Sequence, residues 1–339
     1  MSLSPLPVSA PGKLFLLGEY AVLAGGVALL TTLNRRVFVK PRSDDRGYEV
    51  RGGSVEDPLR LPMLVQQVLR QKLNREVNLN SLSADVSQFY DGEQKLGLGS
   101  SAASTVALLS SVAPDLSPSQ RFDLAWEIHH RLQGKLGSGA DIAASVFGSN
   151  IAYRLHADAQ QPPFDALSLP PFSPIDVDPI ATPLATIHPL DALPDDIRLD
   201  AVWTGRPAHS TSFIRGVKRA IEDAPQRVQR LFVDLAEASE SGIDALVDDR
   251  SADLFDTFAA ADRAMEALGE VCDLPIITDD HRHIRALAHT SNSVAKPSGA
   301  GGGDFSLLLS PRDAALPQPI IDQYPTFPVH PLQQSDPHT

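Results

Sequence analysis

Apolar residues follow two spacings along the chain, and each spacing predicts a different kind of element. The short apolar run at 14–17 is typical of a buried strand, and 27–33 and 36–40 predict further strands. Over 61–73 the apolar residues recur every three or four positions, which predicts a helix that packs through one stripe. Further helices are predicted over 120–132, 213–222, 226–239, 251–268 and 279–290, and further strands over 151–155, 200–204 and 305–309. This mixture predicts an α+β protein.

A proline-rich stretch interrupts the pattern between 161 and about 199. A chain of 339 residues is long enough for about two domains, and such a stretch is a typical boundary. We therefore predict an N-terminal domain over 1–165, a proline-rich connection over 166–195, a helix-rich α+β domain over 196–312 and a proline-rich, partly disordered tail over 313–339.

Charge and composition narrow the classes of partner. The formal net charge of −13 argues against a general nucleic-acid or anionic-membrane surface. The most apolar stretch, 14–33, contains Glu19 and several glycines, so we predict neither a signal peptide nor a membrane span. The single cysteine, Cys272, cannot form an internal disulfide, which fits a cytoplasmic protein. We expect a small-molecule substrate, no nucleic acid, no membrane, and a monomer or homodimer.

A glycine-rich stretch near the middle of the first half carries the first candidate chemistry. Lys95-Leu96-Gly97-Leu98-Gly99-Ser100-Ser101 leads into residues that favour helix from Ala102 onwards. Free N–H groups at a helix start form an anion site, to which Lys95 would add a full charge. No Gly-Lys-Ser or Gly-Lys-Thr closes the stretch, so it is not a Walker loop. The alternative is an ordinary glycine-rich turn with serine caps.

Two further glycine-rich segments lie on either side of the proline-rich stretch. Gly137-Ser138-Gly139-Ala140-Asp141 leads into a predicted helix, and Ser298-Gly299-Ala300-Gly301-Gly302-Gly303-Asp304 precedes a predicted strand. Each segment lies beside a lysine or carries a carboxylate. Together they predict one cleft between two domains rather than three unrelated turns.

Two of these glycine-rich segments and a third segment near the N-terminus resemble the motifs of a known superfamily. The segments 11–22 (Pro-Gly-Lys followed by Gly18-Glu19-Tyr20), 97–103 and 298–304 resemble, in this order, the motifs of galactokinases, homoserine kinases, mevalonate kinases and phosphomevalonate kinases. The resemblance covers nearly the whole chain. It implies a two-domain α+β kinase with an N-terminal domain similar to domain 2 of ribosomal protein S5, a ferredoxin-like C-terminal domain, and ATP and Mg²⁺ as cofactors.

Within the superfamily the details resemble the phosphomevalonate kinases. Tyr20 stands where mevalonate kinases usually have histidine, and the segments 137–145 and 203–211 also look like phosphomevalonate kinases. His129 and His130 stand about where mevalonate kinases place an acidic magnesium ligand, so that ligand is not carried over; Glu127 is out of register. The implied reaction is ATP-dependent phosphorylation of (R)-5-phosphomevalonate to 5-diphosphomevalonate. The alternatives are a mevalonate kinase or a kinase of another small hydroxy acid, a related decarboxylase, and a non-catalytic sensor of ATP or substrate.

The motifs assign candidate roles to individual residues. The predicted catalytic residues are Lys13, beside the transferring phosphoryl group, and Asp141, which the resemblance implies to be a base or an orienting carboxylate. Predicted nucleotide contacts are Lys95, Gly97, Leu98, Gly99, Ser100, Ser101 and Ala102; predicted magnesium ligands are Ser101 and Glu19. Predicted acceptor contacts are Tyr20, Ser138, Arg206, Ser210, Lys296, Ser298, Gly299, Ala300 and Gly301. For Lys13, Lys95, Arg206 and Lys296 the alternative is an ordinary surface residue, and for Asp141 a first-turn complement to the helix dipole.

Overall fold

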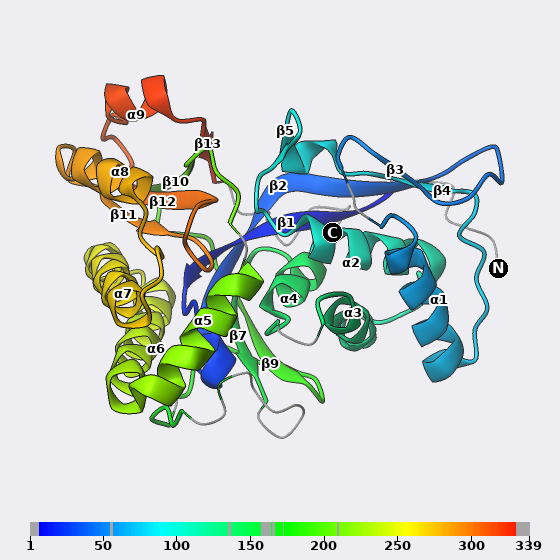
Figure 1. Cartoon of the computed structure of the whole chain (residues 1–339), viewed down its shortest axis with the longest axis horizontal. Coiled ribbons are helices and arrows are strands. Elements are labelled where there is room, and N and C mark those ends of the chain that lie inside the picture. The colour runs from blue at the N-terminus through cyan, green and yellow to red at the C-terminus, as the bar shows by residue number, and fades with distance from the viewer. Residues whose placement is uncertain are drawn as a thin grey trace.

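A computed structural model describes residues 7–54, 57–134, 137–156, 164, 167–171, 173–208 and 210–329. Two β-sheets organise the molecule (Figure 1). The larger has seven strands in the order β3-β4-β2-β7-β9-β8, with β1 paired to β2. Its strands are β1 Val8–Leu17, β2 Val27–Pro41, β3 Glu49–Arg51, β4 Leu82–Asp85, β7 Asn150–Leu155, β8 Ile180–Ala181 and β9 Ala185–Leu190.

The two longest strands of this sheet, β1 and β2, pair antiparallel and differ from their prediction in two ways. β1 begins at Val8, ahead of the predicted run at 14–17, so the segment 11–13 lies inside the strand. The ranges 27–33 and 36–40, predicted as separate strands, form the single strand β2. Between Pro11 and Gly12 the partner on β2 jumps from Arg36 to Leu33, which is a β-bulge. The bulge explains why the apolar pattern of β2 is interrupted there while pairing continues.

Helices cover the larger sheet, and one of them is central. They are α1 Arg60–Leu73, α2 Ser100–Val112, α3 Pro118–Leu132 and α4 Ala140–Phe147. Between α1 and α2 lie β4, the 3₁₀ helix η2 Ser87–Phe89 and a small hairpin of β5 Tyr90–Asp91 with β6 Gln94–Lys95. Helix α2 packs against β1, β2, α3 and α4, and its side chains are small or apolar on nearly every side. A helix enclosed in this way needs an apolar surface all round.

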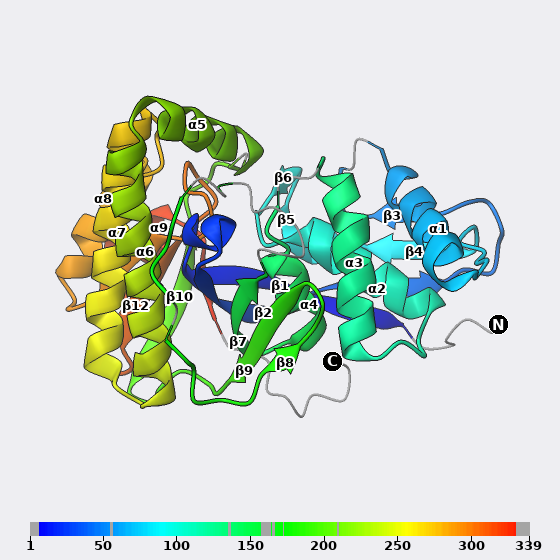
Figure 2. The same cartoon turned by 90° about the horizontal axis from the view of Figure 1, so that it is seen from below.

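The second sheet has four antiparallel strands in the order β11-β12-β10-β13. The strands are β10 Ile197–Trp203, β11 Val294–Pro297, β12 Phe305–Pro311 and β13 Thr326–Pro328; the helices are α5 Ser210–Asp223, α6 Pro225–Val247, α7 Ser251–Cys272, α8 Asp279–His289 and α9 Gln318–Gln323. Helices α5 to α8 connect β10 to β11, and α9 connects β12 to β13. This β-α-β-β-α-β order is ferredoxin-like, so the predicted class of the second domain is confirmed. In Figure 2, α6 and α7 run side by side and α5 extends from them towards the first domain.

The proline-rich connection and the tail contain more structure than their composition indicated. Strands β8 and β9, from the predicted connection, join the larger sheet through β7, and the next strand, β10, belongs to the second sheet. The exact domain boundaries stay a prediction. Helix α9 and strand β13 lie within the predicted tail, and β13 pairs with β10; residues 330–339 lie outside the described residues. Among the described residues no helix is long and apolar enough to cross a membrane.

Candidate active site

A cavity of about 150 Å³ lies where the two domains meet. Segments from four parts of the chain line it: the end of β1 with the following 3₁₀ helix η1 Ala21–Ala24, the start of α4, the start of α5 and the loop after β11. Of the predicted site residues, the cavity brings together Lys13, Glu19, Tyr20, Ser138, Asp141, Ser210, Gly299 and Ala300. Residues that are 287 positions apart in sequence, such as Lys13 and Ala300, therefore share one wall.

The glycine-rich loop before α2 has the geometry expected of an anion-binding loop. Gly97 and Gly99 have φ values of 72° and 79°, a left-handed conformation that favours glycine. Gly99 is the N-cap of α2, and no side chain caps this end of the helix. Ser100 and Ser101 lie in the first turn, so the alternative of serines that only cap does not describe this loop. The first N–H groups of α2 are positioned as donors for an anion.

Lys13 connects this loop to the cavity. Its backbone N–H donates to the carbonyl of Leu98 at 3.0 Å, and its side chain runs so close to Gly99 that an added Cβ there would lie 3.2 Å from Lys13 Cγ. The Lys13 side chain therefore passes from the helix start towards the cavity, where its ammonium can neutralise phosphate charge. Lys95 lies exposed at the end of β6 and is not among the described residues that line the cavity.

Asp141 lies in the first turn of α4 with one carboxylate oxygen held and the other facing a histidine. Its Oδ1 accepts from the backbone N–H of Ile142 at 3.0 Å, and its Oδ2 lies 3.8 Å from Nε2 of His129. Burial lowers the pKa of His129, despite the nearby carboxylate, so the imidazole is neutral at pH 7. The side-chain amide of Gln133 lies 3.2 Å from the same Nε2. Sequence reasoning considered His129 only as a missing magnesium ligand; its four-residue spacing from Gln133, which places both on one face of α3, was the available signal.

The start of α5 supplies hydroxyl groups to the acceptor side of the cavity. Ser210 and Thr211 line it, as does Ile214 one turn further. Phe213 fixes this end of the helix against the loop after β11, because a Cβ on Gly302 would lie 2.1 Å from the Phe213 ring. Only glycine at position 302 allows this approach.

Several predicted acceptor contacts lie elsewhere. The Lys296 ammonium is fully enclosed and 2.5 Å from Glu19 Oε1, so Lys296 has no surface for substrate. The second oxygen of Glu19, Oε2, has no hydrogen-bond partner among the described residues, and its magnesium role stays a prediction. Arg206 is 76% exposed and lies 3.8 Å from Asp280. Neither Lys296 nor Arg206 is among the described residues that line the cavity, and their acceptor roles stay predictions. The sequence does not reveal which distant partner a charged side chain meets. Among the remaining predicted contacts, the Ser298 hydroxyl is bound to the backbone of Phe15. Gly301 is packed against the carbonyl of Ile276.

The donors near the cavity fit a nucleotide-bound Mg²⁺ better than a metal held by protein alone. The described residues contain no group of three or more histidine, cysteine, aspartate or glutamate side chains arranged to hold a metal. Magnesium on a nucleotide needs only one or two protein oxygens, because phosphates and waters complete its shell. The half-exposed Ser101 and the Asp141 carboxylate, which is 21% exposed, have the chemistry for this role. A magnesium role for Ser101 stays a prediction.

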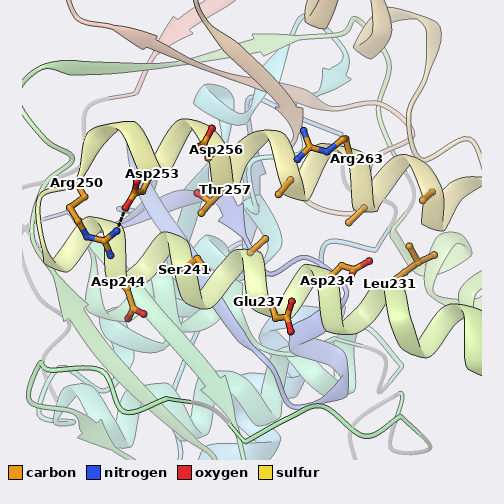
Figure 3. A pocket seen from close by; sticks show the side chains of 14 residues that line it. Leu231, Asp234, Glu237, Ser241, Asp244, Arg250, Asp253, Asp256, Thr257 and Arg263 are labelled. Carbon is orange, nitrogen blue, oxygen red and sulfur yellow. Dashed lines mark ion pairs between the residues drawn. The ribbon is translucent and has the colours of Figure 1, made fainter.

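A larger groove of about 900 Å³ lies between α6 and α7 (Figure 3). Its charged lining consists of the carboxylates Asp234, Glu237, Asp244, Asp253 and Asp256 and the guanidinium groups of Arg250 and Arg263. Arg250 and Asp253 form an ion pair, shown as a dashed line. The described lining contains no glycine-rich loop. The excess of carboxylates would repel a polyphosphate, so the cavity between the domains is the candidate active site.

Comparison with known proteins gives a family and several relatives. Residues 64–149 match the family GHMP kinases N terminal domain. The chain is 29% identical over 344 residues to a phosphomevalonate kinase from Streptomyces sp. (strain CL190), covering 90% of each chain. Its fold matches that of Streptococcus pneumoniae phosphomevalonate kinase in complex with phosphomevalonate and AMPPNP with a TM-score of 0.74 and 20% identity, over 96% of this chain and 100% of that one. It matches L. major mevalonate kinase in complex with R-mevalonate with a TM-score of 0.68 and 18% identity, over 97% of each chain.

Proposed function

We propose that this chain, which belongs to the GHMP kinase superfamily and is an ATP-dependent small-molecule kinase, uses 5-phosphomevalonate as its acceptor. The products are 5-diphosphomevalonate and ADP. The cavity between the domains carries the proposal, because it joins Lys13, Asp141 and the start of α5 beside the glycine-rich loop of α2. The similarity to the Streptomyces phosphomevalonate kinase, which extends over 90% of each chain, supports this acceptor.

The proposed reaction is an in-line transfer of the γ-phosphoryl group. An oxygen of the acceptor phosphate forms a bond to the γ-phosphorus of ATP, and the bond from that phosphorus to the bridging oxygen breaks, so that ADP leaves with the electron pair. Lys13 neutralises charge between the two phosphates, which otherwise repel. The N–H groups at the start of α2 hold the phosphates of the nucleotide. Magnesium bound with the nucleotide would supply further neutralisation, with the Ser101 hydroxyl as its proposed protein ligand.

Asp141 has an orienting role in this proposal. The attacking oxygen belongs to a phosphate that is already ionised near neutral pH, so the step does not depend on removal of a proton. The backbone of Ile142 fixes one oxygen of Asp141, and the second oxygen remains available at the cavity. A carboxylate fixed in this way can orient the acceptor or the metal shell.

One observation favours mevalonate as a second candidate acceptor. Among the described residues that line the cavity, Lys13 is the only lysine or arginine. A phosphorylated acceptor carries more negative charge than mevalonate and gains more from several cations. With mevalonate, Asp141 would have to accept the proton of the attacking hydroxyl, which is the role of a general base.

The acceptor is tested by measuring ADP release with purified protein, Mg²⁺ and ATP. 5-Phosphomevalonate, mevalonate and no acceptor are compared side by side. We expect kcat/KM to be at least 100-fold higher with 5-phosphomevalonate than with mevalonate. A preference for mevalonate would change the assigned acceptor but not the assignment as a kinase. ADP release no faster than the acceptor-free rate with both compounds would contradict the proposed function.

A further inference from the structure

A buried ion pair joins the two domains beneath the cavity. Lys296, at the end of β11, places its ammonium 2.5 Å from Oε1 of Glu19, just after β1. The two side chains are 0% and 1% exposed. The ammonium also donates to the carbonyl of Pro297 at 2.6 Å and lies 5.7 Å from the centre of the Phe258 ring. Enclosing two charges costs desolvation energy that their attraction often fails to offset, so stability alone does not explain the pair.

Neutral hydrogen bonds join the same two segments on the cavity side of the ion pair. The Tyr20 hydroxyl donates to the carbonyl of Ala300 at 2.5 Å. The Ser298 hydroxyl accepts from the N–H of Phe15 and donates to its carbonyl, both at 3.0 Å. Phe15, Tyr20 and Ala300 also line the cavity. These contacts, with the ion pair, form a tether between residues 15–20 and 296–300 that is itself part of the cavity wall.

The backbone at the first end of the tether is strained. Tyr20 has φ 61° and ψ −50°, a conformation that non-glycine residues rarely adopt. The neighbouring Gly18 has φ 85°, and a Cβ there would lie 2.3 Å from the carbonyl of Val27. Strain of this kind persists only where surrounding contacts hold it, and it collects at functional sites. The buried pair and the Tyr20 hydroxyl are the polar contacts of this turn with the loop after β11, and α6 packs against the turn from another side.

We propose that Lys296 is a positioning residue that acts through Glu19: it fixes the turn after β1 against the loop after β11, so that the acceptor wall of the cavity is already formed in the free protein. Lys296 does not touch substrate. The kinetic consequence rests on the proposed function, whereas the tether itself does not. A wall that is already formed lowers the entropy cost of binding the acceptor. Loss of the tether should therefore weaken acceptor binding more than nucleotide binding.

The test uses the double variant Glu19→Gln/Lys296→Met, which keeps side-chain size and removes both charges. Removing both partners avoids the isolated buried charge that the single variant Lys296→Met would leave. We expect the KM for 5-phosphomevalonate to rise at least tenfold while the KM for ATP changes less than twofold. Without ligands, backbone amides in 296–303 should exchange with deuterium at least tenfold faster than in the natural protein. Lys40→Met, an exposed lysine at the far end of β2, is the matched control and should change neither quantity.

The outcomes separate the tether from the acceptor assignment. If the natural protein releases no ADP with either acceptor, the proposed function fails and the exchange measurement alone decides the tether. If the double variant folds and keeps both its acceptor KM and its exchange within twofold of the natural protein, the positioning role is wrong. Tyr20→Phe removes only the bond to the carbonyl of Ala300 and serves if the double variant does not fold. It should raise exchange in 296–303 two- to threefold, and unchanged exchange would contradict the tether.

Discussion

The cavity between the domains and the groove between α6 and α7 differ in size and in the parts of the chain that form them. The groove is the larger, at about 900 Å³ against about 150 Å³. Two consecutive helices form the groove (Figure 3), whereas four distant segments from both domains form the cavity. Exposed faces of two packed helices leave such a groove without any specific cause. Convergence of distant segments requires the whole fold, and it is the better sign of a functional site.

The charges of the two regions differ as well. The groove presents five carboxylates and two guanidinium groups from helix surfaces. The described part of the cavity combines Lys13 and Asp141 with hydroxyl groups and enclosed polar contacts, next to the start of α2. Polar groups that are held in place cost little reorganisation when charge moves during a reaction, whereas solvated side chains must be ordered first. Small changes in the cavity should therefore have large effects, and equal changes in the groove small ones.

The largest expected difference comes from removing one carboxylate charge in each region. Asp141→Asn should lower kcat by a factor of about 10², because the amide keeps the shape but does not orient the acceptor or a metal shell as a carboxylate does. Asp256→Asn, an exposed carboxylate of the groove, should keep kcat within twofold. Steady-state ADP release measures both. A rate above half of the natural value for Asp141→Asn would show that this carboxylate has no part in the transfer.

Lowering the pH should reduce the folding stability of the second domain on its cavity side, because His281 is buried in its neutral form. Burial lowers the pKa of His281 to about 4, and Asp280 opposes this only partly. The unfolded chain, with a histidine pKa near 6.5, binds the proton first, so the stability from this group is complete above pH 6.5 and is lost as the pH falls towards 4. Between pH 7.5 and 5 the loss is about 2 kcal/mol.

The measurement is urea unfolding of the natural protein and of His281→Gln at both pH values. The variant should lose about 2 kcal/mol less than the natural protein on acidification. His289→Gln, an exposed histidine of the same helix, should behave like the natural protein. Equal pH dependence in all three proteins would remove His281 as the cause. Amides in 298–304, which precede β12 beside this histidine, should lose protection from exchange before those of α6 and α7.

Local features of the fold and the site were predictable from the sequence. The turns at Gly97 and Gly99, the start of α2 and the helix that carries Asp141 follow from residue preferences within a few positions. The strands β8, β9 and β13 were missed because they are short and owe their stability to distant partners. In the predicted tail, for example, the Phe327 ring packs against Phe305 of β12, a contact that composition does not reveal.

The roles of charged side chains were less predictable. Lys296 was predicted to contact the acceptor because the charges of the acceptor need basic groups; in the structure its ammonium is bonded to Glu19, 277 positions away. Arg206 had the right local context and points to Asp280 instead. Glycine motifs encode backbone shape locally, whereas the partner of a lysine or arginine depends on the tertiary arrangement. For this reason the shape of these loops is easier to predict from the sequence than the partners of Lys296 and Arg206.

The smallest change that should affect the candidate active site is the addition of one methyl group to the glycine-rich loop before α2. An added Cβ at Gly97 would lie 2.2 Å from Cγ of Asp304, whose Oδ1 accepts from the N–H of Ala208 at 2.9 Å. Gly97→Ala must therefore shift the loop, and we expect the KM for ATP to rise about tenfold, equivalent to about 1.4 kcal/mol, with acceptor KM within twofold. Gly92→Ala is the matched control, because Gly92 also has positive φ, 58°, but no atom lies within 4 Å of its added Cβ. If both variants raise the KM for ATP equally, backbone strain explains the effect; if only Gly97→Ala does, the contact with Asp304 sets the position of the loop.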